Sequence, residues 1–173
     1  RTACSEEEKM IKNKELGVLM SPIPSPRGLY FEEFQVGQHI VTAARTVTES
    51  DVVTFAGLSG DYNQIHTDAA FSQSTPFGQR VAHGLLCLSI VSGLAMRTGV
   101  LEGTVLAFRE INEWKFIKPV FLGDTIHAEL DVTETKAFPR LNAGAVTIAI
   151  QVKNQRDEVV MKGNWITLVM SKP

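Results

Sequence analysis

The residue types that could do chemistry gather in one short stretch, GDYNQIHTD, at positions 60–68. This stretch places Asp61 and His66 five positions apart, in a turn-rich segment that precedes a long apolar run. A carboxylate and an imidazole can exchange protons near neutral pH, since the unperturbed pKa of histidine is about 6.5. Catalytic groups concentrate on loops that a rigid scaffold holds in place. The pair therefore indicates general acid–base chemistry in a pocket.

The apolar run predicts the element that positions this pair. Residues 84–100, GLLCLSIVSGLAMRTGV, are apolar on almost every side of a helix. A helix without a polar face belongs inside a core, and this one is shorter than the roughly 18 apolar residues of a membrane span. We expect a buried helix whose first turn, after VAHG at 81–84, lies close to Asp61 and His66.

Residues 39–74 predict one strand and two short helices. The β-branched run HIVTAARTV at 39–47 is typical of a strand. Thr48 is suited to cap the next helix, with Asp51 in the capping-box position and Gly60 at the end. After the GDYNQIHTD segment, which we expect to be a loop, Asp68 is suited to cap a helical turn in DAAFSQS.

Four β-rich runs follow the apolar helix, separated by turn residues. They span residues 104–117, 124–138, 141–155 and 158–170. Alternation in the third run, with Val146, Ile148, Ile150 and Val152 on one side, predicts an antiparallel sheet with one buried face. The fold class is therefore α+β, a sheet wrapped around a buried helix. A Gly-rich phosphate loop is not found in the sequence, and a Rossmann series is excluded.

Length and composition indicate one globular domain. The chain has 173 residues, of which 44% are hydrophobic and 21% charged. Residues 1–27 are charged and then rich in proline, a composition that favours an extended arm. We expect this arm to precede a single domain at residues 28–173.

Charge and cysteine content narrow the partners and the compartment. A formal net charge of −2 offers no basic excess for a nucleic-acid backbone. Two cysteines give neither a disulfide framework nor a metal-ligand spacing, which fits a reducing cytoplasm. The N-terminal SEEEKMIKNKE lacks the apolar region of a signal peptide. We expect a cytoplasmic protein that binds neither nucleic acid nor a membrane.

Three segments carry a family resemblance: SGDYNQIHTD, FGQRVAHGLLCLSIVSGL and EWKFIKPVFLGDTI. Over about residues 29–170 the chain resembles the MaoC-like, (R)-specific enoyl-CoA hydratases, which implies a single hot-dog domain with its sheet wrapped around a central helix. One position departs from the family pattern, because Gln64 stands where the family usually has proline. We expect this loop to be less stiff than in the family.

The resemblance implies a reaction and the residues for it. Asp61 and His66 would hold and activate a water that adds reversibly to a trans-2-enoyl thioester, giving the (R)-3-hydroxyacyl product. Ser92 would orient the Asp61 carboxylate. The residues leave open which of Asp61 and His66 is the base, and they leave open the acyl chain length.

Physical reasoning adds supporting roles around this pair. The N–H of Gly84 lies at the start of the helix, where backbone donors lack partners and the macrodipole is positive, so it can bind an enolate oxygen. Asn63 is suited to fix the loop by bonding to the backbone. His83, just before Gly84, is expected to shape the turn.

The partners follow from the same chemistry and resemblance. The substrate would be an acyl-CoA, or the same thioester on an acyl carrier protein, and Arg80, Lys115 and Lys118 are candidate partners of the CoA phosphates. Water, acid, base and oxyanion donors suffice for the reaction, so we expect neither a metal ion nor a redox cofactor. The resemblance also implies a homodimer, or a larger assembly, with edge-to-edge pairing.

Two other functions remain open. A hot-dog thioesterase would release free CoA, whereas a hydratase would form 3-hydroxyacyl-CoA. A non-catalytic acyl-thioester-binding protein would bind the ligand without turnover, and Asp61→Asn would leave its binding unchanged.

Overall fold

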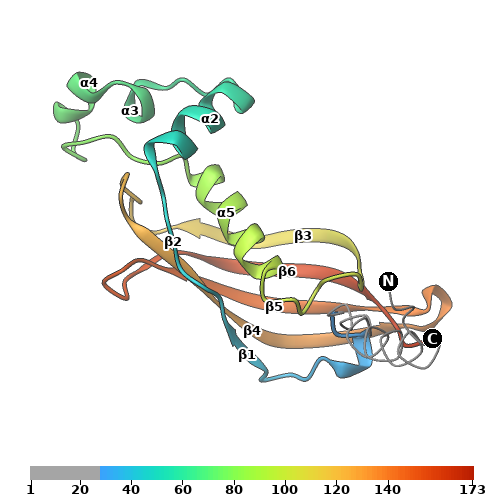
Figure 1. Cartoon of the computed structure of the whole chain (residues 1–173). Coiled ribbons are helices and arrows are strands. Elements are labelled where there is room, and N and C mark those ends of the chain that lie inside the picture. The colour runs from blue at the N-terminus through green and yellow to red at the C-terminus, as the bar shows by residue number, and fades with distance from the viewer. Residues whose placement is uncertain (1–27) are drawn as a thin grey trace, which may run out of the picture.

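The computed structural model describes residues 28–173, and the predicted arm at residues 1–27 lies outside this range. A six-stranded antiparallel sheet forms the body (Figure 1), with the order β1-β4-β5-β6-β3 and β2 paired to β4. The strands are β1 (His39–Val41), β2 (Arg45–Thr46), β3 (Val105–Phe116), β4 (Thr125–Phe138), β5 (Ala143–Lys153) and β6 (Val159–Met170). The helices are α2 (Glu49–Ser59), α3 (Gln64–Thr67), α4 (Ala69–Gln73) and α5 (Gly84–Met96), with 3-10 turns η1 (Phe31–Glu33) and η2 (Pro139–Leu141).

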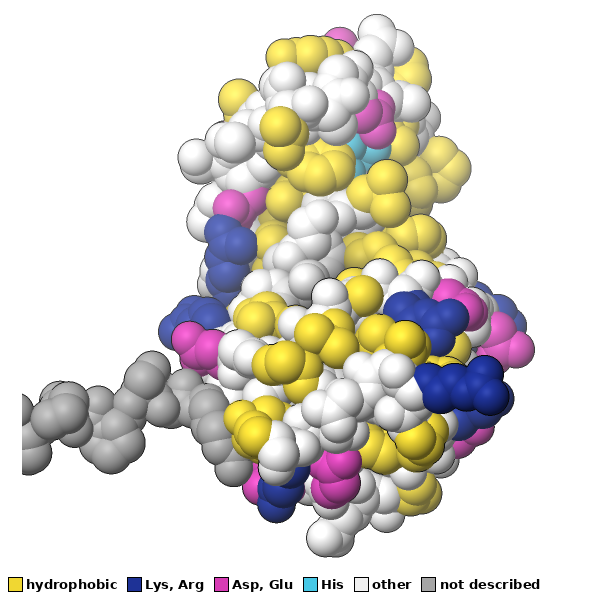
Figure 2. Space-filling model, turned by 90° about the vertical axis from the view of Figure 1, so that its right-hand side faces the viewer, with side chains coloured by type: hydrophobic (Ala, Val, Ile, Leu, Met, Phe, Trp, Pro, Cys, Tyr) yellow, Lys and Arg dark blue, Asp and Glu magenta, His cyan; other side chains and the backbone are white. Residues whose placement is uncertain are grey.

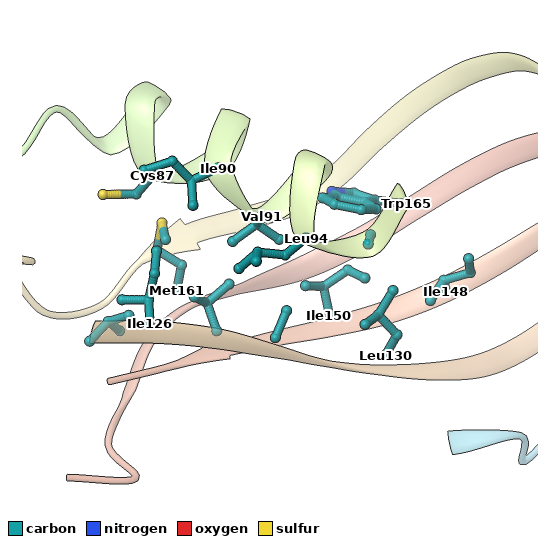
Figure 3. Close-up of a cluster of buried hydrophobic side chains, with 14 of the residues drawn as sticks. Cys87, Ile90, Val91, Leu94, Ile126, Leu130, Ile148, Ile150, Met161 and Trp165 are labelled. Atoms are coloured by element: carbon teal, nitrogen blue, oxygen red, sulfur yellow. The ribbon is translucent and has the colours of Figure 1, made fainter. Parts of the chain in front are cut away.

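Helix α5 lies across one face of the sheet (Figure 1), and the predicted burial holds for the side that faces the sheet. The prediction of a helix without an exposed face is wrong, because Leu85, Ser89, Ser92 and Met96 on the opposite side are exposed. Ile90, Val91 and Leu94 point from α5 toward side chains of the sheet (Figure 3), and Cys87 belongs to the same buried cluster. On β5 the predicted alternation is confirmed, because Val146, Ile148, Ile150 and Val152 are each at most 2% exposed. Each such side chain stabilises the fold by about 1.5–3 kcal/mol through burial, so α5 is held firmly on the sheet.

The four predicted β-rich runs correspond to β3 through β6, but the predicted strand at 39–47 is divided. Thr42 separates β1 from β2 by pairing with Ala128 in an unusual way. Its N–H donates to the Ala128 carbonyl at 2.9 Å, while its side-chain Oγ1 accepts the Ala128 N–H at 2.9 Å. Because a hydroxyl takes the place of a ladder carbonyl, the regular strand pattern stops there.

Helices α2, α3 and α4 form a small layer beyond the N-terminal end of α5 (Figure 1). The predicted cap of α2 is confirmed, since Thr48 Oγ1 accepts the N–H of Asp51, and the Asp51 carboxylate accepts the N–H of Thr48. Gly60 ends the helix with a φ of 77°. Asp68 caps α4 by accepting the N–H of Phe71 at 2.9 Å. These local signals fix both flanks of the Asp61–His66 segment.

Strand β3 lies at an edge of the sheet and pairs only with β6 within the described range. Several of its apolar side chains are exposed, among them Leu106, Phe108, Ile111 and Phe116. No helix between residues 28 and 173 is long and apolar enough to cross a membrane.

Candidate active site

Asp61, His66 and His83 meet at the N-terminal end of α5. Each contributes one carboxylate or ring-nitrogen atom, and these three atoms lie within 4.8 Å of one another. Asp61 is exposed, whereas His66 and His83 are 8% and 2% exposed. Figure 2 shows a histidine beside an acidic side chain in the upper part of the molecule, with hydrophobic side chains around them. The predicted Asp61–His66 pair is thus a pair in space.

The backbone around Asp61 is more regular than the loop that the sequence predicts. Gln64–Thr67 form the single turn of α3, and Asn63 caps it, because its Oδ1 accepts the N–H of Ile65 at 3.2 Å. The Asp61 carboxylate accepts the N–H of Asn63 at 3.2 Å. The expectation that Asn63 bonds to the backbone is confirmed, and the expectation of a loop at His66 is wrong. The four residues between Asn63 and Asp68 were enough for one helical turn.

The His66 ring is anchored through one nitrogen, which leaves the other free. Its Nδ1 lies 2.7 Å from the carbonyl oxygen of Val81, and a carbonyl only accepts, so Nδ1 carries the hydrogen. Nε2 of the neutral ring is then an acceptor. Burial lowers the pKa of His66, and His83 lowers it further, against the opposing effects of the Val81 hydrogen bond and of Asp61. The neutral imidazole is therefore favoured at neutral pH.

Gly84 is the first residue of α5 and lies against the ring of Phe116. A Cβ on Gly84 would come within 2.6 Å of that ring, so any other residue would have to displace the ring. Among the described residues, no hydrogen bond takes up the N–H of Gly84, as expected for the first turn of a helix. The contact between Phe116 and Gly84 was not predicted from the sequence, because it joins segments far apart in the chain.

A mostly apolar pocket of about 420 Å³ opens beside Gly84. Its lining comes from the α5 N-terminus and the end of β3, together with Cys87 and Met161 at its buried end. The lining residues are Phe77, Val81, Ala82, Gly84, Leu85, Cys87, Phe116, Ile117, Lys118, Pro119, Val120 and Met161. Asp61 and His66 do not line it, but Val81, whose carbonyl holds His66, does. The pocket therefore adjoins the polar cluster.

Asp61, His66 and His83 also have the composition of a metal site, one carboxylate and two imidazoles. One nitrogen of each ring is bonded to a main-chain carbonyl, of Val81 for His66 and of Asp61 for His83. The remaining nitrogen of His83, Nδ1, is fully buried, and the two rings are stacked face to face at 3.8 Å. As folded, the open donor atoms are those of Asp61 and His66, an arrangement suited to holding a water.

Comparison with known proteins identifies the family. Residues 33–154 match the family described as MaoC like domain. The chain belongs to the MaoC-like family. A 3-hydroxybutyryl-CoA dehydratase of Methylorubrum extorquens is 33% identical over 150 residues, covering 87% of this chain and 90% of that protein. Protein MaoC of Klebsiella aerogenes is 43% identical over 101 residues, which cover 58% of this chain but only 30% of that protein.

Solved structures agree with this assignment. A monoamine oxidase regulatory protein from Archaeoglobus fulgidus superposes with a TM-score of 0.79 at 39% identity, covering 85% of this chain and 97% of that one. The R-hydratase PhaJ1 from Pseudomonas aeruginosa superposes with a TM-score of 0.70 at 33% identity, covering 84% of this chain and 88% of that one. A Mycobacterium tuberculosis protein with a double hotdog fold superposes with a TM-score of 0.75 at 17% identity, covering 84% of this chain and 45% of that one. The predicted MaoC-like, hot-dog dehydratase family and the α+β hot-dog fold are confirmed.

In this MaoC-like domain, Ser92 is not brought to Asp61. Ser92 is exposed on α5, eight residues after Gly84, which is about 12 Å along a helix axis. Over the described range, the hydrogen bond to the Asp61 carboxylate comes from the N–H of Asn63 and not from Ser92. The carboxylate is therefore oriented by the backbone of its own turn.

The three predicted phosphate-binding residues lie apart from one another. Arg80 forms a two-pronged pair with Glu49, with Nη1 at 2.8 Å from the carboxylate, and Lys118 pairs with Glu158 at 2.7 Å on the rim of the pocket. Lys115 faces Lys162 on the side of the sheet that α5 does not cover. Of the three, only Lys118 borders the pocket.

Proposed function

We propose that this protein is a hydro-lyase that reversibly adds water to a trans-2-enoyl thioester to give an (R)-3-hydroxyacyl thioester. One observation carries the proposal: a ring nitrogen of His66 and a carboxylate oxygen of Asp61 lie within 4.8 Å of each other at the start of α5. A water bonded to both at about 2.8 Å holds its partners about 4.6 Å apart. The relatives named as dehydratase and R-hydratase support the same reaction class.

The proton transfers follow from the state of each group. Nε2 of neutral His66 accepts a proton from the water while Asp61 holds the other side of that water. The water oxygen bonds to C3, the C2–C3 π bond breaks, and the electron pair moves to the thioester oxygen as an enolate. When the carbonyl forms again, C2 takes the proton from His66 on the same face, so the addition is syn. The (R) configuration rests on the family.

The enolate oxygen needs a donor that is in place before the reaction. The N–H of Gly84 has no partner in the described part of the chain and lies next to His83 in the sequence, beside the polar cluster. Removing one such donor costs an enzyme about 3 kcal/mol of transition-state stabilisation. The absence of a Cβ at Gly84 lets the thioester approach this N–H closely.

The substrate binds as a thioester, on CoA or on an acyl carrier protein, with its acyl chain in the apolar pocket beside Gly84. We also propose that two copies of the chain pair through the free edge of β3, whose exposed apolar side chains would then be covered. The cytoplasm is the proposed compartment.

Enoyl-CoAs of short, long and branched chains test the reaction through the loss of conjugated absorbance, with chiral analysis of the product. Asp61→Asn and His66→Gln should each lower kcat at least about a hundredfold. Asp131→Asn is the matched control, because Asp131 lies on β4 in a pair with exposed His39. Near-normal turnover in both site variants contradicts the proposal. Release of free CoA instead indicates a thioesterase, and binding without turnover indicates a binding protein.

A further inference from the structure

His83 links the three groups of the proposed reaction. It is the N-cap residue of α5, but its side chain makes no capping bond to the helix. Instead, its Nε2 lies 2.9 Å from the main-chain carbonyl oxygen of Asp61, 22 residues earlier in the chain. A carbonyl can only accept, so Nε2 carries the hydrogen and donates it. The bond ties the backbone of Asp61 to the residue that directly precedes Gly84.

The His83 ring also supports the ring of His66. The two imidazoles are stacked, with centroids 3.8 Å apart and planes inclined by 30°. On another element, Phe55 of α2 contacts His83 at 5.0 Å and 53°. His83 is 2% exposed, so its ring cannot turn without moving these neighbours. The stack thereby fixes the plane of the His66 ring, and the hydrogen bond to the Val81 carbonyl fixes which way Nδ1 of that ring points.

The second nitrogen of His83 makes no hydrogen bond. Nδ1 is buried and has no hydrogen-bond partner within the described residues. The ionisable groups that face His83 are His66 and the Asp61 carboxylate, and that carboxylate makes no hydrogen bond to the ring. The bond to the Asp61 carbonyl therefore places a hydrogen on Nε2 of His83.

We propose that His83 is a positioning residue of the hydration reaction: its hydrogen bond to the Asp61 carbonyl and its stack on His66 hold the carboxylate, the imidazole and the Gly84 N–H in register. This inference rests on the proposed function. His83 does not touch the substrate in this mechanism, because its free nitrogen is buried. A misplacement of about 1 Å at a reacting group can lower a rate about a hundredfold, so such a tie has a measurable effect.

The tautomers can be read directly by nitrogen-15 NMR of the imidazole rings in the full chain at neutral pH. The expected spectrum shows a hydrogen on Nε2 of His83 and a hydrogen on Nδ1 of His66. Absence of the hydrogen on Nε2 of His83 overturns the inference. This measurement needs no substrate, so its outcome is independent of whether the proposed function holds.

Two substitutions separate the hydrogen bond from other contributions of the ring. His83→Gln places an amide N–H near the position of Nε2, and His83→Phe keeps a stacking ring but removes the donor. We expect His83→Phe to lower kcat about tenfold to a hundredfold with KM nearly unchanged, and His83→Gln to recover most of that loss. His39→Gln, on exposed His39 of β1, is the matched control and should leave kcat unchanged.

Equal losses in the two His83 variants, or wild-type kcat in His83→Phe, overturn the inference while the proposed function stands. Absence of hydration by the wild-type chain counts against the proposed function instead. Circular dichroism and Tm show whether each variant is folded, and an unfolded His83→Phe leaves the NMR result as the deciding one.

Discussion

The contact between Gly84 and Phe116 allows a test of how closely the start of α5 must be packed. In Gly84→Ala the new Cβ would lie 2.6 Å from the Phe116 ring, whereas carbon atoms normally approach to about 3.5 Å. The ring must therefore move by about 1 Å. Phe116 is 54% exposed and can yield, so we expect a loss of about 1 kcal/mol of stability, or about 2–4 °C in Tm.

The effect on catalysis should be larger than the effect on stability. Gly84 and Phe116 both line the pocket, so the displaced ring and the added methyl both narrow the space beside the proposed oxyanion donor. We expect kcat for enoyl-CoA hydration to fall about tenfold to a hundredfold. Steady-state kinetics and thermal unfolding measure the two effects on the same samples.

Gly93→Ala is the matched control, since it makes the same change on the same helix. A Cβ on Gly93 would meet nothing within 4 Å, and alanine favours a helix interior over glycine by about 0.5–1 kcal/mol. Its Tm should rise and its kcat should not change. If Gly84→Ala keeps wild-type kcat, the reasoning is refuted. If adding Phe116→Ala to Gly84→Ala does not restore Tm toward that of Phe116→Ala alone, the assumed clash is refuted.

Three further outcomes follow from the same structure. The pKa of His66 is lowered in the folded protein, so as the pH falls below about 6.5 the unfolded chain binds a proton before the folded chain does, and stability falls. The Tm of the wild-type protein should therefore decline more steeply with falling pH than the Tm of His66→Gln. Equal dependence of Tm on pH in the two proteins contradicts this prediction. Burial raises the pKa of Cys87 to about 12, so iodoacetamide should modify this thiol at pH 8 only in denaturant, which mass spectrometry can follow. Thr48→Ala removes the cap of α2 and should lower stability by about 1 kcal/mol, and an unchanged midpoint in urea would show that the cap is dispensable.

The sequence predicts well those features that depend on neighbouring residues. Thr48 with Asp51, Asp68 at the start of α4, and the alternation along β5 all behave as expected. Each is a local pattern, since a cap acts within one turn and alternation follows from the pleat of the strand. The apolar composition of α5 predicted its packing on the core, but not the exposed side that carries Leu85, Ser89 and Met96.

Features that depend on distant contacts were not predictable in this way. The Val81 carbonyl that holds His66 is a backbone group, so no residue type marks it. Arg80 and Lys118 were candidates for phosphate binding as cations, but their partners Glu49 and Glu158 lie 31 and 40 positions away in the chain. Only the tertiary fold shows which charges are already paired. Ion pairs of such partly exposed cations contribute little to the stability of the fold.

Gln64, which departs from the family pattern, lies in a turn whose backbone proline would also fit. Gln64 is the first residue of α3, a position that proline favours because its N–H has no helical partner. Asn63 before it has a ψ of 134°, within the range that a following proline requires. The Gln64 carbonyl accepts the N–H of Asp68 at 2.9 Å, and the Ser72 hydroxyl donates to the Asp68 carbonyl at 2.7 Å. The folded turn thus has a backbone that proline would also fit, so a proline at this position would act mainly by restricting the unfolded chain.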